Sequence, residues 1–526
     1  MSEWSSGYVT DAGYTYGYYP ELNPVRARLA LTMASVAAPE IRNACELGFG
    51  QGVSLNIHAT AAGARWYGND FNPAHAAYAR NLANTVGNEA VVLDDSFEEF
   101  LQRDDLPEFD YIGLHGIWTW VSHENRARLV EIIRRRLRVG GIVYMSYNAL
   151  PGWAAASPLR HLIAEHGSGA SRRDPPTPDR ALAAVEFAGE VLNLSKLWSE
   201  ATPSLKGRIE RLKKHDKRYL AHEYMNRDWH PMYFADVARL LGDAKLEFAA
   251  SASFPEISSR LGLSQEQRDF LDKISDAVHR ESVRDFFVNQ QFRRDYWVKG
   301  AHRLNRAERN ERLRQFSIIL TGDPAGDPPK LRSGGTDISL KADVYQPILA
   351  LLTDRKPHSL GDIERELSAK DVSMEVITLA TQVLIGGSLA GVVADAPSDT
   401  TLERCRRFNR QVLERSHLDG EIMQLASPVI GGAVSATRAQ QFFLKRCLEG
   451  EVPGATRPTI EDLAVAAWKG FRILGQRLIR DGKTLESDED NLQELRTQAE
   501  KFLRVTMPNW RALRIVETAA SAAPTS

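Results

Sequence analysis

Short apolar runs alternate with helix-patterned stretches over the first 150 residues. Five runs are predicted as strands, at 44–45, 65–70, 90–93, 110–114 and 141–145. Four amphipathic stretches separate them, and residues 137–140 predict a helix end that leads into the fifth strand. Strands that alternate with helices over about 110 residues predict a doubly wound α/β domain.

The apolar pattern changes after residue 160. Residues 181–220 carry apolar side chains three and four apart, which predicts helices. Beyond residue 340 the pattern predicts three helices and a strand, an order that resembles a winged helix. The length favours about three domains. We place them at 1–160 (α/β), 161–330 (a mixed middle domain) and 340–526 (a mostly helical, winged-helix-like domain).

Three alternating glycines follow the first strand, in Glu46-Leu47-Gly48-Phe49-Gly50-Gln51-Gly52. Glycine accepts positive φ and lets a ligand approach the backbone. The next helix would offer unpaired N–H groups and a partial positive charge. A dinucleotide turn has G-x-G-x-x-G, which would need a glycine where this chain has Val53. The pattern E-x-G-x-G-x-G resembles the motif of class I S-adenosylmethionine (SAM) methyltransferases.

Polar residues at the next strand ends extend this resemblance. Asp70 ends the second predicted strand and would hold the ribose hydroxyls, and Phe71 would pack on the adenine. Asp95 or Ser96, after the third strand, would meet the adenine amino group. The alternative is an α/β fold for another nucleotide or for none. The resemblance implies a Rossmann-like domain with the cofactor S-adenosyl-L-methionine, held by Glu46, Gly48, Gly50, Gly52, Asp70, Phe71, Asp95 and Ser96.

Four tyrosines between residues 14 and 19 predict an aromatic arm before the first domain. In many SAM enzymes such an arm folds over the cofactor, because aromatic faces favour a sulfonium cation and exclude water. We therefore count Tyr16 among the cofactor-binding residues. The alternative is a strap packed on the core.

The fourth and fifth strands end in segments 115–120 and 146–153, which are aromatic with a few polar groups. Ligands bind at the carboxyl ends of strands in open α/β sheets. Such a lining suits an amine or a flexible side chain. We predict a catalytic or substrate-binding role for His115, Trp118, Tyr147 and Asn148. His115 is also a candidate for contact with the cofactor, or for packing.

The same two segments, His-Gly-Ile-Trp-Thr-Trp-Val and Ser-Tyr-Asn-x-Leu-Pro-Gly-Trp, are similar to bacterial methyltransferases with a methyltransferase regulatory domain. That group includes rickettsial protein lysine methyltransferases, and the similarity continues at 224–234 and 284–295. The resemblance implies methyl transfer to a protein, with a lysine amine as the best single assignment. A small-molecule or glycan O- or N-methyltransferase and a non-catalytic SAM-binding regulator are the alternatives.

Charge and cysteine content restrict the partners. The chain has a net charge of −2, which argues against a general nucleic-acid binder. Residues 1–150 contain twelve arginines, seventeen acidic residues and no lysine, so an acidic face there would suit a lysine-bearing substrate. The third winged-helix-like helix lacks arginine and lysine, so we expect no DNA binding.

The three cysteines have no paired spacing, so we expect no metal centre and a reducing cytoplasm. The chain has no apolar run long enough for a membrane span. Whether it forms a homodimer is left open.

Overall fold

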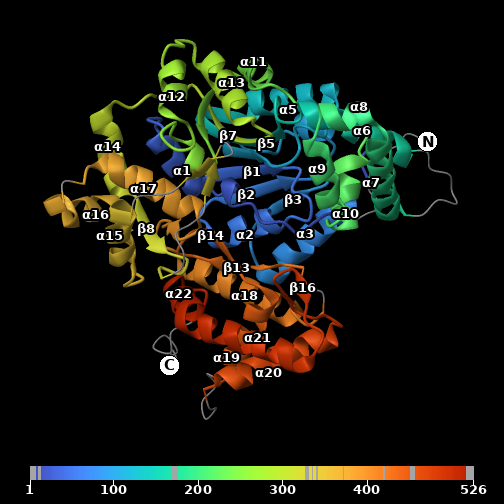
Figure 1. Cartoon of the computed structure of the whole chain (residues 1–526). Coiled ribbons are helices and arrows are strands. Elements are labelled where there is room, and N and C mark those ends of the chain that lie inside the picture. The colour runs from blue at the N-terminus through green and yellow to red at the C-terminus, as the bar shows by residue number, and fades with distance from the viewer. Residues whose placement is uncertain are drawn as a thin grey trace.

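A seven-stranded sheet lies at the centre of the computed structural model (Figure 1). The structure describes residues 7–9, 13–168, 176–325, 331–333, 336–338, 342–370, 372–418, 421–450 and 457–516. The strand order is β3-β2-β1-β4-β5-β7-β6. The strands are β1 (Asn43–Leu47), β2 (Arg65–Asn69), β3 (Val91–Leu93), β4 (Phe109–Leu114), β5 (Leu137–Asn148), β6 (Leu246–Ser251) and β7 (Phe292–Lys299). The predicted α/β sheet is therefore confirmed.

Six of these strands run in one direction, and β7 lies antiparallel between β5 and β6. Tyr144 of β5 pairs with Tyr296 of β7. The predicted helix end is present, since α5 (His123–Arg136) has its C-cap at Leu137, but β5 begins directly at that residue and not at residue 141. Leu137 pairs with Phe109, and a register shift follows this pair before β4 and β5 resume pairing.

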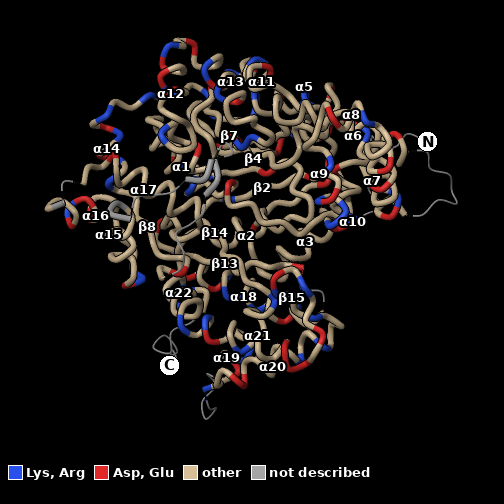
Figure 2. The backbone as a smooth tube through the Cα atoms, in the orientation of Figure 1, with Lys and Arg blue, Asp and Glu red and all other residues tan. Residues whose placement is uncertain are grey.

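The two faces of the sheet bury different side chains. Ile142 and Val143 of β5 are neighbours in sequence but belong to different apolar clusters, since successive side chains of a strand point to opposite faces. One cluster includes α1 (Pro24–Met33), and the other includes α5 and α11 (Phe234–Gly242). Charged residues lie mostly on the outer helices and loops, while the sheet is mostly uncharged (Figure 2).

A separate helical layer follows the fifth strand and has its own apolar cluster. It comprises α6 (Ser157–Ser168), α7 (Thr177–Leu194), α8 (Lys196–Ala201), α9 (Ser204–Leu212) and α10 (Lys217–Tyr224). Trp153, just after β5, belongs to the same cluster. This layer is therefore anchored beside the carboxyl end of β5.

The segment 161–330 also supplies strands β6 and β7 to the central sheet, so the sheet extends beyond residues 1–160. Between these strands lie α12 (Gln265–Leu271) and α13 (Ala277–Val288). Arg293 on β7 is buried and forms ion pairs with Asp285 and Asp295. This pairing compensates the buried charges and fixes α13 against the sheet.

The predicted order of three helices and a strand is present beyond the central sheet. The elements are β8 (Ser317–Leu320), α15 (Ala342–Leu352), β11 (His358–Ser359), α16 (Leu360–Glu366), α17 (Met374–Gly386) and β12 (Ala390–Val392). On α17, Thr381 and Gln382 are buried, and Glu375 pairs with Arg260 of the middle segment. The helix that would enter a DNA groove in a winged helix therefore packs inside this chain.

The C-terminal helices pack against the α/β domain rather than standing apart from it. Phe408 on α18 (Asp399–Arg415) shares an apolar cluster with Ile57 of α2 (Val53–Ala61) and Leu82 of α3 (Pro73–Val86). This region also contains β13 (Gln424–Ser427), β14 (Gly432–Ser435), α19 (Arg438–Gly450), α20 (Ile460–Ile473), β15 (Ile479–Arg480), β16 (Lys483–Thr484), α21 (Asp488–Lys501) and α22 (Met507–Ala512). Within the described ranges, no helix combines the length and apolar character needed to cross a bilayer.

Candidate functional site

The glycine loop lies between β1 and α2, as its sequence predicts. Gly48, Gly50 and Gly52 all have positive φ, at 73°, 58° and 69°. A Cβ on Gly50 would lie 2.8 Å from Cδ1 of Tyr14, and one on Gly52 would lie 2.6 Å from Cβ of Ala79. Both positions therefore need glycine for conformation and for space. The first contact also shows that the N-terminal arm covers the loop.

Asp70 connects the end of β2 to this loop. Its Oδ2 accepts a hydrogen bond from the Gly50 N–H at 2.8 Å, and its Oδ1 accepts one from the Asn72 N–H at 3.0 Å. The same Oδ1 lies 3.2 Å from Nδ1 of His75. The sequence-predicted Asp70 and Gly50 are thus in direct contact.

Glu46, at the end of β1, is 2% exposed, and its Oε2 accepts no hydrogen bond from the described residues. Burial, with the nearby Asp70 carboxylate, raises the pKa of Glu46 to about 8. An unpaired buried carboxylate is costly, and a cation placed beside it removes that cost. SAM carries an ammonium and a sulfonium group, so the residues around the glycine loop fit this cofactor.

A cavity of about 240 Å³ lies beside the third strand end. Phe71 and Ser96 line it, together with Phe97, Trp120 and Tyr8. The Tyr8 ring meets Phe71 edge to face, with centroids 5.8 Å apart. These aromatic rings suit the adenine end of SAM, and the rest of the lining includes polar and charged residues such as Asn125 and Asp228.

The two candidates for the adenine amino group differ in their surroundings. Ser96 lines the small cavity but also caps α4 (Phe97–Gln102), where its Oγ accepts a hydrogen bond from the Glu99 N–H. Asp95 lines neither this cavity nor the larger one described below. Its Oδ2 accepts a hydrogen bond from the Arg103 guanidinium at 3.0 Å. The structure therefore brings Ser96 to the cofactor region and assigns the Asp95 carboxylate an ion pair.

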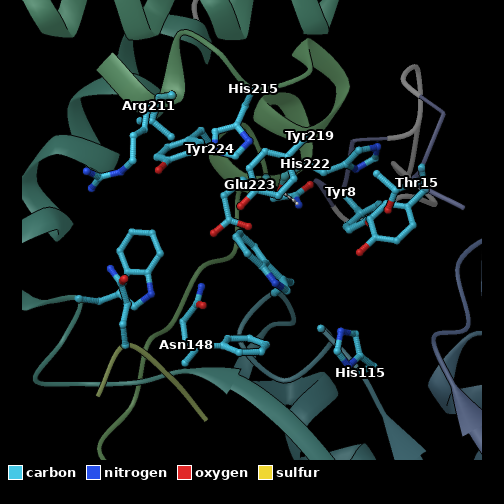
Figure 3. Close-up of a pocket in the computed structure, with 18 of the residues that line it drawn as sticks. Tyr8, Thr15, His115, Asn148, Arg211, His215, Tyr219, His222, Glu223 and Tyr224 are labelled. Atoms are coloured by element: carbon cyan, nitrogen blue, oxygen red, sulfur yellow. Dashed lines mark hydrogen bonds between the residues drawn. The ribbon is translucent and has the colours of Figure 1, made fainter. Parts of the chain in front are cut away.

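A larger cavity of about 500 Å³ opens where β4 and β5 end (Figure 3). The arm supplies Tyr14 and Tyr19 to its lining, Tyr8 contributes from the described residues 7–9, and the strand ends supply His115, Gly116, Trp120, Asn148 and Trp153. The opposite wall comes from the helical layer, through residues of α9, α10 and the turn between them: Arg208, Arg211, Leu212, His215, Tyr219, His222, Glu223 and Tyr224. Tyr8 and Trp120 line both cavities, so the two are adjacent.

Glu223 is the acidic residue of the larger cavity lining. Its carboxylate faces the Asn148 amide (Figure 3). Burial raises the pKa of Glu223 to about 7, while Arg208, Arg160 and the Asn148 amide act in the opposite direction. A carboxyl group that ionises near neutral pH among aromatic rings can bind a cationic amine or exchange a proton with it.

His115 lines the same cavity but is neutral at pH 7, because burial lowers its pKa to about 4. Its ring stacks on Tyr19 at 3.5 Å between centroids, and Nδ1 is hydrogen-bonded to the Tyr144 hydroxyl at 2.8 Å. His115 is therefore well placed to hold the arm over the site.

Three aromatic residues of the predicted site line neither cavity. Trp118 is fully buried in the apolar cluster around α5. Tyr147 is 1% exposed and donates its hydroxyl proton to Asp295, because it points to the face of β5 opposite Asn148. Tyr16 packs edge to face on Tyr78, with centroids 5.2 Å apart, and lines neither cavity.

Most residues of the cavity wall formed by α9 and α10 were not predicted from the sequence. Tyr219, Glu223 and Tyr224 lie on an eight-residue helix whose pattern resembles that of an ordinary surface helix. One signal could have identified Glu223. It is a titratable residue that directly precedes the segment 224–234, which resembles regulatory-domain methyltransferases. Tyr8 was not predicted as a site residue, and within the arm Tyr16 was chosen although Tyr14 lines the cavity.

Two family models match this chain. Residues 45–145 match "Methyltransferase domain", and residues 216–299 match "Predicted methyltransferase regulatory domain". The first range covers the glycine loop and strands β1 to β5 up to Met145. The second begins just before α10 and therefore includes Glu223.

Two relatives share sequence with this chain, one over nearly the whole length of both proteins and one over about half. The protein sll1526 of Synechocystis sp. is 36% identical over 508 residues, which cover 95% of this chain and 97% of the relative. The protein RP789 of Rickettsia prowazekii is 27% identical over 320 residues, which cover 58% of this chain and 55% of the relative.

The solved structure of PKMT2 from Rickettsia typhi in complex with AdoHcy has the same fold. It superposes with a TM-score of 0.65 at 18% identity, covering 95% of this chain and 99% of PKMT2. The likeness extends beyond the sheet to the helical layer and the C-terminal region, since it spans nearly the whole of both chains.

Proposed function

Because this chain belongs to the class I SAM-dependent methyltransferases with a methyltransferase regulatory domain, we propose that it methylates a protein at the side-chain amine of a lysine. It is a SAM-dependent methyltransferase, and its cofactor is S-adenosyl-L-methionine. The acceptor is the part of the reaction that we propose from the site.

The observation that supports an amine acceptor is the composition of the larger cavity. Aromatic rings line it on several sides, and its acidic residue is Glu223. Aromatic faces attract alkylammonium groups, and a carboxylate completes the binding of a cation. A lysine side chain, which ends in an ammonium on a slender apolar stem, matches such a lining.

The residues that would hold the cofactor are those around the glycine loop and the small cavity. Asp70 is placed for the ribose, Phe71 for the adenine, and Glu46 for a positive charge of SAM. When bound, SAM supplies a methyl carbon on a sulfonium leaving group. The protein mainly has to align the acceptor nitrogen with that carbon, and such alignment can contribute up to about 7–11 kcal/mol.

A lysine must be neutral to react, and its free pKa is about 10.4. Transfer from water into a site walled by Tyr14, Tyr19 and Trp153 disfavours the charged form and lowers that pKa. The arm also excludes water from the glycine loop, as the close approach of Tyr14 to Gly50 indicates.

A direct test follows labelled methyl from SAM into a native cell lysate, with Asp70→Ala as the inactive control. We expect label in a few protein bands and methyl-lysine after acid hydrolysis. A second lysate, in which lysines have been acetylated beforehand, should accept little label. Label confined to the small-molecule or polysaccharide fraction would overturn the proposal and favour a small-molecule or glycan methyltransferase.

A further inference from the structure

We infer that Glu223 receives the ammonium group of the acceptor and takes its proton before methyl transfer. The assignment rests on the proposed function, because it requires an amine acceptor. It gives the cavity wall formed by α9 and α10 a role in proton transfer.

The position of Glu223 is the first argument. It lies on α10 and lines the cavity opposite the carboxyl ends of β4 and β5, where its carboxylate faces Asn148 (Figure 3). β1 pairs with β4, and β4 pairs with β5, all in parallel, so the glycine loop follows the same edge of the sheet. The cofactor and Glu223 therefore meet at one edge, as an acceptor group between them requires.

The surrounding charges are the second argument. Arg208 and Arg160 favour the ionised carboxylate, while burial opposes it, so the pKa of Glu223 is about 7. The titratable groups facing Glu223 also include Tyr14 on the arm and Tyr219 and Tyr224 on α10, whose pKa values are all raised. These phenols stay neutral near pH 7, so they do not compete for the proton.

The two arginines are held by other partners. The Arg208 guanidinium lies 4.1 Å from the Trp153 ring centroid. Arg160 donates to the backbone oxygen of Asn226, and its guanidinium lies 5.1 Å from the Trp229 ring centroid. Among the described residues, neither arginine forms an ion pair within 4 Å of Glu223. The carboxylate is thus ionisable but remains available to a ligand.

The proton transfer balances without another reactant. The lysine ammonium gives one proton to the Glu223 carboxylate, which leaves a neutral amine and a carboxylic acid. The nitrogen lone pair then forms the N–C bond while the C–S bond breaks, and that bonding pair stays on sulfur. The methylated nitrogen carries the positive charge, and Glu223 returns its proton to solvent when product leaves.

His115 is the other titratable candidate base at these strand ends, and its environment fits the role less well. Its pKa of about 4 makes it a weak proton acceptor at pH 7, and its Nδ1 is already bonded to Tyr144. Glu223 has the pKa closer to the working pH, which favours proton exchange with an amine.

The test measures the initial rate of methyl-lysine formation in native lysate between pH 6 and 9 for wild type, Glu223→Gln and Glu223→Asp. Glu210→Gln is the matched control, since Glu210 lies on α9, is exposed and pairs with Lys213. SAM affinity, measured by calorimetry, reports whether each variant folds. We expect Glu223→Gln to bind SAM within about twofold of wild type.

For wild type we expect the rate to rise up to pH about 7 and then level off. For Glu223→Gln we expect a loss of at least about 100-fold at pH 7, the lower range for general base catalysis. Its rate should then rise about tenfold for each pH unit, because solvent must deprotonate the lysine. Glu223→Asp should keep the wild-type profile at a reduced rate.

The inference fails if Glu223→Gln retains the wild-type rate and pH profile. If Glu223→Gln does not bind SAM, Glu223→Asp decides: a lysine-like pH profile in that variant would also contradict the inference. A wild-type enzyme that forms no methyl-lysine would instead refute the proposed function. The two failures are therefore distinguishable.

Discussion

Glu46 lies at the end of β1, next to the glycine loop, and Glu223 lines the larger cavity, and burial raises the pKa of both. Glu46 belongs to a parallel strand, and the neighbour that acts on it is another carboxylate, Asp70. Glu223 belongs to a short helix, and its charged neighbours include Arg208 and Arg160. The first carboxylate therefore depends on a cationic ligand for its charge, whereas the second can gain or lose a proton near neutral pH.

This difference separates a binding role from a proton-transfer role. A carboxylate whose charge is disfavoured until a cation arrives serves to bind that cation. A carboxylate whose pKa is kept near 7 by arginines that form no ion pair with it can exchange its proton in each turnover. The cofactor half and the acceptor half of the site should therefore respond differently to substitution.

The largest effect is expected from Asp70→Ala, which removes the acceptor of the Gly50 and Asn72 N–H groups. Each hydrogen bond to a charged group contributes about 1.5–3 kcal/mol. We expect SAM affinity, measured by calorimetry, to fall at least about 100-fold. Asp94→Ala is the control, because Asp94 is half exposed and pairs with Arg80 at the neighbouring strand end. A change below threefold for Asp70→Ala would remove it from the cofactor site.

Glu46→Gln should weaken SAM binding by about 10- to 100-fold, because the charge that attracts the cofactor is lost. The stability of the ligand-free protein should increase with the same substitution at high pH. Since the folded pKa of Glu46 is about 8, above its ordinary value, the stability it contributes is present at low pH and lost as the pH rises through about 8.

The ligand-free Glu46→Gln variant should accordingly melt at a higher temperature than wild type at pH 9 and at a similar temperature at pH 5. Differential scanning fluorimetry at the two pH values measures this. Equal melting temperatures at pH 9, together with unchanged SAM affinity, would show that Glu46 is not the cation-binding carboxylate.

On the acceptor side, Arg208→Gln should shift the pH profile more than it shifts affinity for SAM. Arg208 lowers the pKa of Glu223. Its loss should therefore shift the rising, acidic part of the pH–rate profile to higher pH by up to about one unit. At pH 7 this corresponds to a rate decrease of less than about tenfold. An unchanged acidic part of the profile would argue that Glu223 does not set it.

The smallest catalytic effect is expected from Tyr147→Phe. Tyr147 donates a hydrogen bond to Asp295, which also pairs with Arg293. Loss of that bond should cost about 1–2 kcal/mol and lower the apparent melting temperature by a few degrees. The rate of methyl transfer should change less than twofold. A large loss of rate with unchanged stability would restore Tyr147 to the substrate site.

The cofactor half could be predicted from sequence because its information is local. The glycines at 48, 50 and 52 need positive φ whatever surrounds them, and Asp70 lies one strand away. The alternation of strands and helices then specifies which edge of the sheet carries both. Composition alone would not have separated Ser96 from Asp95, since the difference lies in an ion pair with Arg103.

The acceptor half could not be predicted in the same way. Its second wall comes from α9 and α10, and no local pattern says that this short helix faces β5 and not solvent. Tyr147 and Asn148 are adjacent in sequence, yet they point to opposite faces of the strand. An aromatic-rich segment therefore suggests a binding wall but does not say which of its residues face the ligand.

Strand β7 has a consequence for the synthesis of this protein. It pairs with β5, but residue 292 is translated 144 residues after residue 148. At synthesis rates of about 5–20 residues per second, that interval lasts roughly 7 to 30 seconds. Throughout it, β5 would be an open edge of the sheet, which is a surface prone to aggregation. The enzyme's yield in cells should therefore depend on chaperones that cover this edge on the ribosome.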